Sequence, residues 1–343
     1  MKSRAVFVIA LSVFSVVSAC AQKAVTDQPA KPEDQSPHTV QFVSVDKGLK
    51  LEVLDWGRTG RPVLLLAGLG YDAHVFDVFA LKLSSSYHVY GISRRGYGGS
   101  SAPKPDGENY SADRLGDDIL AVMDALKIER PVLVGHSIAG EELSSIGSRY
   151  PDKVAGLVYL DAGYADAYYN DNAKQGQDPV TDITKVQVEL DKFKNYLPPK
   201  EQRIEAEHLL NVSLPRLERD IREGLKQAQN TPDNPPAPPD TPSVRAGIAI
   251  RRGTQIYTGV KCPVLAIFAL PHDFGPLGNT DPAVRAEMVS KDVALVSEQA
   301  DVFQAGNPQA RVVRIANANH FVFRSNEADV LREMNGFIAK LPQ

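Results

Sequence analysis

A short apolar run that ends in a glycine-rich turn constrains this chain more than any other stretch. Val132 to Val134 is typical of a buried strand and leads into Gly135-His136-Ser137-Ile138-Ala139-Gly140. The segment from Glu141 to Tyr150 then has helical character. A strand, a tight turn and a helix in this order need small residues in the turn, because larger side chains would collide with the neighbouring strand and helix. The pattern predicts a turn that points the hydroxyl of Ser137 out of a sheet, beside backbone N–H groups.

The turn leaves two interpretations open when it is taken alone. Ala139 stands where the strict G-x-S-x-G pattern has its second glycine. Ser137 is therefore either a catalytic nucleophile or part of an ordinary tight loop in an α/β fold. The surrounding residues have to decide between them.

Composition sets the outer limits. The chain has 343 residues, of which 43% are hydrophobic and 23% are charged, and its formal net charge is −4. This is ordinary globular composition, with length for one large α/β domain or two average ones. Acidic and basic residues are mixed along the chain and form no basic stripe, so nucleic acid is not expected as a partner.

The N-terminus predicts export. Lys2 and Arg4 precede the apolar run Ala5 to Val17, which is too short to span a bilayer, and small residues follow. Cleavage after Ala21 fits a secretory signal, whereas Val17-Ser18-Ala19-Cys20 resembles a bacterial lipobox that would make Cys20 a lipidated N-terminus. We favour the lipoprotein, located in the periplasm or anchored to the outer membrane. Any membrane contact would then run through the lipid on Cys20.

Residues 22–37 are polar and contain proline, as expected of a disordered tether that follows the signal segment at 1–21. Cys20 and Cys262 are the two cysteines of the sequence, so no disulfide framework and no Cys/His metal cluster are expected. Cys262 begins an apolar strand and is interpreted as a small buried hydrophobic residue.

The rest of the chain alternates between strand and helix patterns. Thr39–Val45 and Lys50–Trp56 form a hairpin pattern around the turn Asp46-Lys47-Gly48. The further predicted strands are 63–66, 87–92, 132–134, 154–160, 263–268 and 311–315, and the predicted helices are 75–83, 111–126, 141–150 and 327–341. This order predicts an α/β fold with a mostly parallel central sheet flanked by helices. Residues 38–161 and 260–343 form the expected core, and 162–259 a helical cap with a proline-rich loop.

A serine nucleophile needs a base and an acid that orients the base. His320 follows the predicted strand 311–315, at the end of a sheet where sites in open α/β folds lie. Asp273 follows the strand 263–268 and is the favoured acid, because the acid usually precedes the histidine by one strand. Asp161, at the end of the strand 154–160, is the alternative acid and is otherwise a turn or cap residue. His272 is interpreted as a polar neighbour of Asp273.

An oxyanion needs backbone donors. The N–H of Ile138, directly after the nucleophile, is one expected donor. The loop after residues 63–66 should supply the other, most plausibly from Leu69, since Gly68 and Gly70 allow a close approach.

Four motifs in this order resemble the α/β-hydrolase superfamily, in its single-domain form with a helical cap. They are Ala67-Gly68-Leu69-Gly70, Arg95-Gly96-Tyr97-Gly98-Gly99-Ser100, the turn around Ser137, and Asn319-His320-Phe321. Ala67 and Ala139 depart from the superfamily's usual histidine and glycine. The resemblance implies a serine hydrolase that cleaves a carboxylic ester or related acyl bond of a small molecule through an acyl-enzyme intermediate. It implies no cofactor and no metal. Ser137 argues against epoxide hydrolases and haloalkane dehalogenases, which use a carboxylate at this position.

Other functions stay open at this point. Gly68-x-Gly70-x-x-Ala73 also matches a dinucleotide motif, and Arg94 and Arg95 could favour NADP in a Rossmann-type oxidoreductase. A non-catalytic ligand-binding protein on the same fold is a second alternative. Within the hydrolases, an aminopeptidase or amidase and a C–C bond hydrolase remain possible.

Three residues are candidates for substrate binding. Glu142 could select a cationic substrate, although acidic residues in a first helical turn also suit the helix dipole. His136 and Tyr168 are further candidates for lining the pocket. His136 lies next to Ser137, and Tyr168 follows the strand 154–160.

Overall fold

The computed structural model describes residues 36–171, 179–229, 237–275 and 281–342. The predicted signal segment and Cys20 lie outside the described residues. Among the described helices, none is long and apolar enough to cross a membrane. The chain divides into two compact units, one containing Gly176–Pro238 and the other containing Pro29–Gln175 and Pro239–Gln343.

The larger unit is built around one sheet of eight strands in the order β1-β2-β4-β3-β5-β6-β7-β8. Its strands are β1 (Thr39–Asp46), β2 (Leu49–Asp55), β3 (Pro62–Leu66), β4 (His88–Ile92), β5 (Val132–His136), β6 (Gly156–Leu160), β7 (Val264–Ala269) and β8 (Arg311–Ile315). The β1–β2 hairpin joins antiparallel, and β4, β3, β5, β6, β7 and β8 are mutually parallel. The prediction of a mostly parallel sheet with an antiparallel edge is confirmed.

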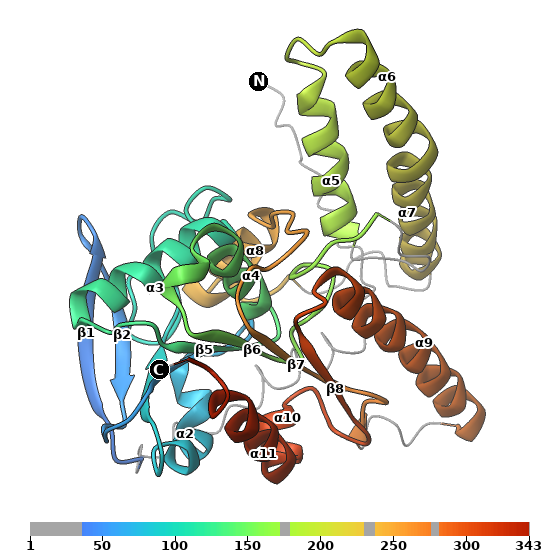
Figure 1. Ribbon diagram of the computed structural model, residues 1–343. Helices are drawn as coiled ribbons and strands as arrows, with labels where there is room; N and C mark the ends of the chain where they lie inside the picture. Colours follow the sequence, from blue (N-terminus) through green and yellow to red (C-terminus); the bar gives the residue numbers. More distant parts are fainter. Residues whose placement is uncertain (1–35, 172–178, 230–236, 276–280, 343) are drawn as a thin grey trace. The chain divides into compact units, whose positions relative to one another are not determined.

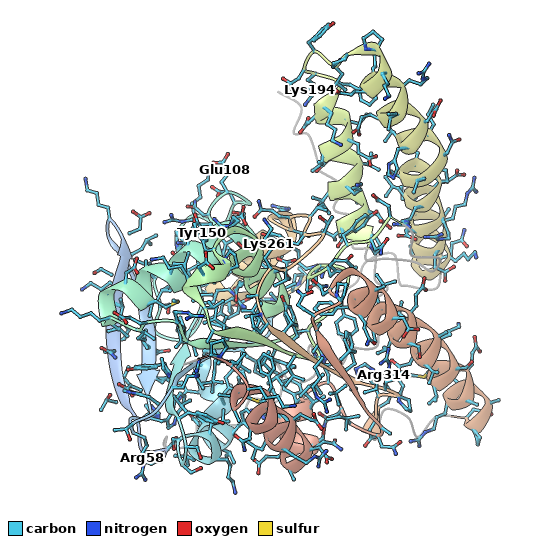
Figure 2. The ribbon with its side chains drawn as sticks, in the orientation of Figure 1. Arg58, Glu108, Tyr150, Lys194, Lys261 and Arg314 are labelled. Atoms are coloured by element: carbon cyan, nitrogen blue, oxygen red, sulfur yellow. The ribbon has the colours of Figure 1, made fainter. Side chains whose placement is uncertain are left out.

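Helices cover both faces of this sheet (Figure 1). Because successive side chains of a strand point to opposite faces, Leu64 packs with one cluster and Leu65 with the other. The helices of this unit are η1 (Ala73–Phe76), α2 (Asp77–Leu83), α3 (Ala112–Leu126), α4 (Ala139–Arg149), η2 (Pro151–Lys153), α8 (Pro242–Arg252), α9 (Pro282–Gly306), α10 (Val322–Ser325) and α11 (Glu327–Ile338). Long charged residues such as Arg58, Glu108 and Arg314 are exposed and point outward (Figure 2).

The smaller unit is helical. It contains α5 (Pro179–Lys192), α6 (Pro199–His208), the π-helical turn η3 (Leu209–Ser213) and α7 (Leu214–Gln229). α5 packs against α7 and η3, and Figure 1 shows α6, η3 and α7 as one continuous run.

The boundaries of the insertion differ from those expected. Residues 162–171 and α8 belong to the larger unit, although the sequence places them within the 162–259 cap. α8 packs its Ala246, Ala249 and Ile250 against Tyr97 and Ile138. Small apolar residues on one face of α8 allow this close packing onto the core.

Gly140 is the most crowded position of the turn after β5. A Cβ at this position would lie 2.0 Å from the carbonyl oxygen of Ala162 and 2.9 Å from the Cβ of Ala167. Ala139 is accommodated with its side chain fully buried. The glycine that the turn cannot lose is therefore Gly140, at the point where α4 meets the loop after β6.

Gly140→Ala should lower the free energy of unfolding by at least about 1–3 kcal/mol, because backbone would have to move to admit the methyl group. Urea unfolding followed by circular dichroism measures this. Gly336→Ala is the matched control, since it adds a methyl group in α11 where no atom lies within 4 Å. The control should be neutral or more stable by up to about 1 kcal/mol. Equal effects of the two substitutions would contradict this explanation.

Candidate active site

Ser137 lies directly after β5, in the turn that leads into α4. Its φ angle is 55°, in the left-handed region that non-glycine residues rarely adopt. Its backbone N–H donates to the carbonyl of Leu160 at 3.3 Å, which holds the turn against the end of β6. A serine in this conformation is typical of a nucleophile elbow, where strain is retained for function.

The loop after β3 approaches this serine closely. A Cβ on Gly68 would lie 2.8 Å from His136 Nδ1 and 3.1 Å from Ser137 Cβ, so only glycine fits. Leu69 packs against the cluster that contains Ile138. Among the hydrogen bonds of the described residues, neither the Leu69 nor the Ile138 N–H donates to another protein group. The assignment of both N–H groups as oxyanion donors stays a prediction.

Arg94 ties this loop to the helix that follows the serine. Its Nη2 donates to the carbonyl of Ala67 at 2.8 Å, and its Nε donates to Glu142 Oε1 on α4. Arg94 and Glu142 are both buried. Burial raises the pKa of Glu142, and the charge and hydrogen bond of Arg94 offset only part of that increase. Glu142 thus has its cationic partner within the protein, and its assignment as a selector of cationic substrates is wrong.

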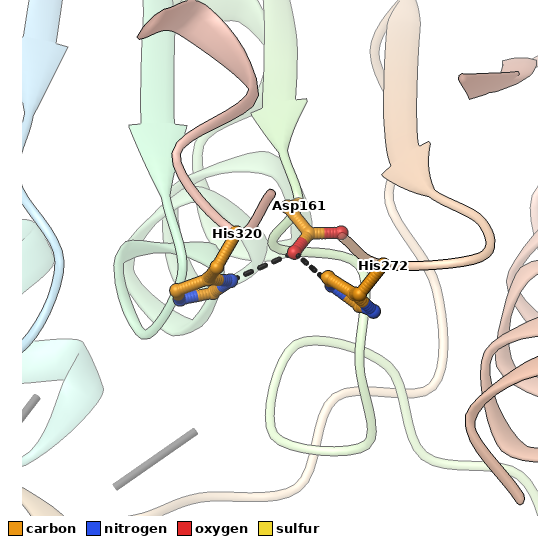
Figure 3. A group of neighbouring side chains, drawn as sticks. All are labelled: Asp161, His272 and His320. Atoms are coloured by element: carbon orange, nitrogen blue, oxygen red, sulfur yellow. Dashed lines mark hydrogen bonds and ion pairs between the residues drawn. The ribbon is translucent and has the colours of Figure 1, made fainter. Parts of the chain in front are cut away.

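His320 meets a carboxylate at the end of β6. Its Nδ1 lies 2.7 Å from Oδ2 of Asp161, which directly follows β6 (Figure 3). His320 is also next to the serine's strand, because its carbonyl is 2.9 Å from His136 Nε2 and the two rings are 4.6 Å apart. His320, Asp161 and Ser137 thus gather where β5, β6 and β8 end.

The favoured acid of the sequence analysis was the wrong aspartate. Asp273 is exposed, its Oδ1 accepts from the N–H of Gly275 at 2.9 Å, and its own N–H donates to Ala318. These contacts make Asp273 a turn residue. The alternative, Asp161, holds His320, because its φ of 48° turns the chain at the strand end and directs the carboxylate across the ends of β7 and β8.

Asp161 is fully buried and accepts four hydrogen bonds. Oδ1 accepts from the Tyr164 hydroxyl at 2.7 Å and the Ala269 N–H at 2.9 Å. Oδ2 accepts from His320 at 2.7 Å and from His272 at 2.8 Å. Burial alone would raise the pKa of Asp161, but the charge of His272 and the bonds from both histidines hold it well below its usual range. Asp161 is therefore ionised at neutral pH.

His136 and Tyr168 are buried and do not line an open pocket. Burial, and then the nearby His320, lower the pKa of His136 to about 3, so its ring is neutral. Its Nδ1 faces Gly68 and its Nε2 faces the backbone of His320. Tyr168 packs edge-on against Phe303, with its hydroxyl against Gly306. Both side chains are buried against other protein groups, which corrects their assignment to substrate binding.

His272 and Asp292 complete the group, and sequence analysis missed Asp292. His272 bonds Asp161 through Nε2 and Asp292 through Nδ1, both at 2.8 Å. Asp292 comes from α9, a helix that the sequence analysis did not predict. Asp281-Pro282, which caps α9, was the available signal, because Pro is common at the first position of a helix.

The ligand atoms of Asp161, His272 and His320 lie within 4.8 Å of one another, so a divalent cation could use them. Both ring nitrogens, however, lie at hydrogen-bond distance from a single carboxylate oxygen. A cation would have to displace both ring protons. The geometry fits a hydrogen-bonded network better than a metal site, and the absence of a cofactor stays a prediction.

The two arginines on which the dinucleotide alternative depends are paired with carboxylates of the protein. Arg94 is paired with Glu142, and Arg95 donates to both oxygens of Asp118 at 2.7 and 2.6 Å. Both guanidinium groups are buried. Neither can face the 2′-phosphate of a nucleotide, so the NADP assignment is wrong.

Residues 61–327 match the family model described as "alpha/beta hydrolase fold". The chain belongs to this family. The resemblance inferred from the four motifs is thereby confirmed, and the sheet order and the serine turn of the α/β-hydrolase fold are those described above.

Relatives within the α/β-hydrolase family have different named reactions. The chain is similar to a fluoroacetate dehalogenase of a Burkholderia species, with 37% identity over 31% of this chain and 35% of the relative. It is also similar to epoxide hydrolase 4 of Mus musculus, with 31% identity over 38% of this chain and 37% of the relative. The match thus spans little more than a third of either relative.

Solved structures of the α/β-hydrolase fold extend the likeness over most of the chain. The structure of E-2-(acetamidomethylene)succinate hydrolase has a TM-score of 0.52 and 19% identity, and covers 88% of this chain and 99% of that one. An esterase from Exiguobacterium antarcticum has a TM-score of 0.55 and 16% identity, covering 88% of this chain and 100% of that one. At such identities the likeness concerns the fold.

Arg94→Met should lower the free energy of unfolding by about 3–5 kcal/mol, because it leaves the Glu142 carboxylate buried and unpaired. The double variant Arg94→Met with Glu142→Met should regain most of this loss, since no charge remains buried. Arg245→Met is the matched control for an exposed pair, with Asp240 at 2.7 Å, and should cost less than about 1 kcal/mol. Chemical denaturation measures all three, and a double variant no more stable than Arg94→Met would contradict the assignment.

Proposed function

We propose that this protein is a serine hydrolase that cleaves a carboxylic ester or a related acyl bond of a small molecule. Ser137 is the nucleophile, His320 the base and Asp161 the acid that orients the base. The observation that carries the proposal is the buried hydrogen bond between His320 and Asp161, at the sheet edge where the strained Ser137 stands.

Three features support a serine mechanism. The serine stands at the position that carries a carboxylate in epoxide hydrolases and haloalkane dehalogenases, so those reactions do not transfer from the named relatives. Asp161 is ionised and fully buried, as expected of a group that holds the imidazole in one tautomer. The N–H groups of Leu69 and Ile138 lie on the two segments that flank Ser137.

In the acylation step, His320 Nε2 takes the proton of the Ser137 hydroxyl while Oγ attacks the acyl carbonyl. The oxyanion that forms accepts hydrogen bonds from Leu69 and Ile138, each worth about 3 kcal/mol in the transition state. His320 then passes its proton to the leaving alcohol or amine as the carbon–heteroatom bond breaks. Asp161 stays ionised and stabilises the imidazolium meanwhile.

In the deacylation step, a water molecule takes the place of the alcohol. His320 removes a proton from the water, which attacks the acyl-serine carbonyl at the same oxyanion position. The tetrahedral intermediate collapses, the ester bond to Oγ breaks, and His320 returns the proton to Ser137. The acid product leaves and the chain is restored.

Ser137→Ala should abolish ester hydrolysis, with a loss of at least about 10⁴-fold in kcat on p-nitrophenyl esters. It should also abolish covalent labelling by a fluorophosphonate probe. Only one hydroxyl is removed, so thermal unfolding should be nearly unchanged. A folded wild-type protein that the probe does not label at Ser137 would favour a non-catalytic binding protein instead.

Asp161→Asn should reduce kcat by about 10⁴-fold, because the amide no longer fixes the His320 tautomer or stabilises its imidazolium. Asp273→Asn is the matched control and should leave kcat unchanged, since Asp273 is exposed and its carboxylate accepts from the N–H of Gly275 rather than from His320. Steady-state kinetics of both variants, with circular dichroism to establish folding, makes the comparison. The opposite ranking would return the acid to Asp273.

A further inference from the structure

His272 has no role in the mechanism above, yet it is built into the site. Its Nε2 lies 2.8 Å from Asp161 Oδ2, the same oxygen that accepts from His320 (Figure 3). Its Nδ1 lies 2.8 Å from Asp292 Oδ1, and its backbone N–H donates to Asp292 Oδ2 at 2.8 Å. The side chains thus form a row in the order Asp292, His272, Asp161, His320.

The two carboxylates make His272 a cation. A neutral imidazole has one N–H, whereas His272 faces a carboxylate oxygen with each ring nitrogen, so both must donate. Burial by itself lowers the pKa of His272, but the charges and hydrogen bonds of Asp161 and Asp292 outweigh it and raise the pKa to about 10. His272 therefore carries a proton throughout the neutral pH range.

Two neutral groups and two charged groups lie around the row. Burial, followed by the charge of Asp161, raises the pKa of Tyr164 well above its ordinary value, so its hydroxyl stays a neutral donor. His136, on β5, is also neutral. Asp166 acts on Tyr164, and Arg324 on α10 acts on His136. The fixed charges that face His320 through the row are thus two carboxylates and one imidazolium.

We propose that His272 is a positioning residue that clamps Asp161 toward His320 and, as a fixed cation, extends the activity of the site to lower pH. The inference rests on the proposed function of Ser137, His320 and Asp161. A carboxylate alone stabilises a protonated histidine beside it. A cation bound to the same oxygen offsets part of that attraction, so the site should stay active at lower pH than it would without His272.

The test is the pH dependence of Ser137 labelling by a fluorophosphonate probe, which needs no known substrate. His272→Gln removes the cation but retains a donor for Asp161. In a plot of the logarithm of the labelling rate constant against pH, the acid limb of His272→Gln should lie about 1 pH unit above that of the wild-type protein. The rate above the limb should fall by about 10-fold, as for other residues that orient a catalytic group.

His88→Gln is the matched control, because His88 also pairs with an aspartate, Asp55 at 2.9 Å, but at the opposite end of the sheet. It should leave both the limb and the rate unchanged. An acid limb in His272→Gln that stays in place or moves to lower pH would overturn the proposal, even if the rate falls, since a purely structural role lowers the rate alone.

A second measurement does not depend on activity. A histidine whose pKa is raised from 6.5 to about 10 on folding contributes stability that is fully present below pH 6.5 and is lost as the pH rises toward 10. Between pH 6.5 and about pH 10, the free energy of unfolding of the wild-type protein should fall relative to that of His272→Gln. Parallel stability curves would overturn the cationic role of His272 whether or not Ser137 is labelled. Failure to label Ser137 together with converging stability curves would instead overturn the proposed function and leave the clamp on Asp161 intact.

Discussion

The buried carboxylate of Asp161 is the interaction on which the site depends. A charge with no solvent contact must be matched inside the protein, and its four hydrogen-bond donors come from three parts of the chain. The Ala269 N–H ends β7, Tyr164 lies beyond β6, and the two histidines follow β7 and β8. The hydrogen bonds that replace water around this one carboxylate therefore fix the ends of three neighbouring strands relative to one another.

A second buried charge, that of Arg94, fixes other backbone segments near Ser137. Arg94 connects the carbonyl before Gly68 with Glu142 on α4, so the two backbone segments that would hold an oxyanion are bound to one guanidinium group. Packing of α8 onto Ile138 adds an apolar cover. The geometry around the serine thus rests on charges that the reaction itself does not use.

Local patterns in the sequence were sufficient to predict the sheet and to place Ser137 and His320 after strand ends, because an apolar strand or a glycine turn extends over only a few residues. The acid required more than that. Asp273 and Asp161 both follow apolar strands, and only the backbone turn at Asp161 and the bond from His320 distinguish them. Asp292 was missed because α9 buries few of its residues, among them Val296 and Phe303, and so lacks a clear apolar stripe. Neither the pattern of a strand nor that of a helix shows which distant segments of the chain come into contact.

The position of Asp161 at the end of β6 has a consequence for how such a site can evolve. The loop after β7, which carries His272, and α9, which carries Asp292, hold no group that the proposed chemistry consumes. Under the proposed mechanism, substitutions there would adjust the charge around His320 while the strand ends that place Ser137, His320 and Asp161 stay as they are. Geometry and charge balance would then lie on separate segments, so natural selection could alter the pH range of activity without changing the proposed catalytic residues.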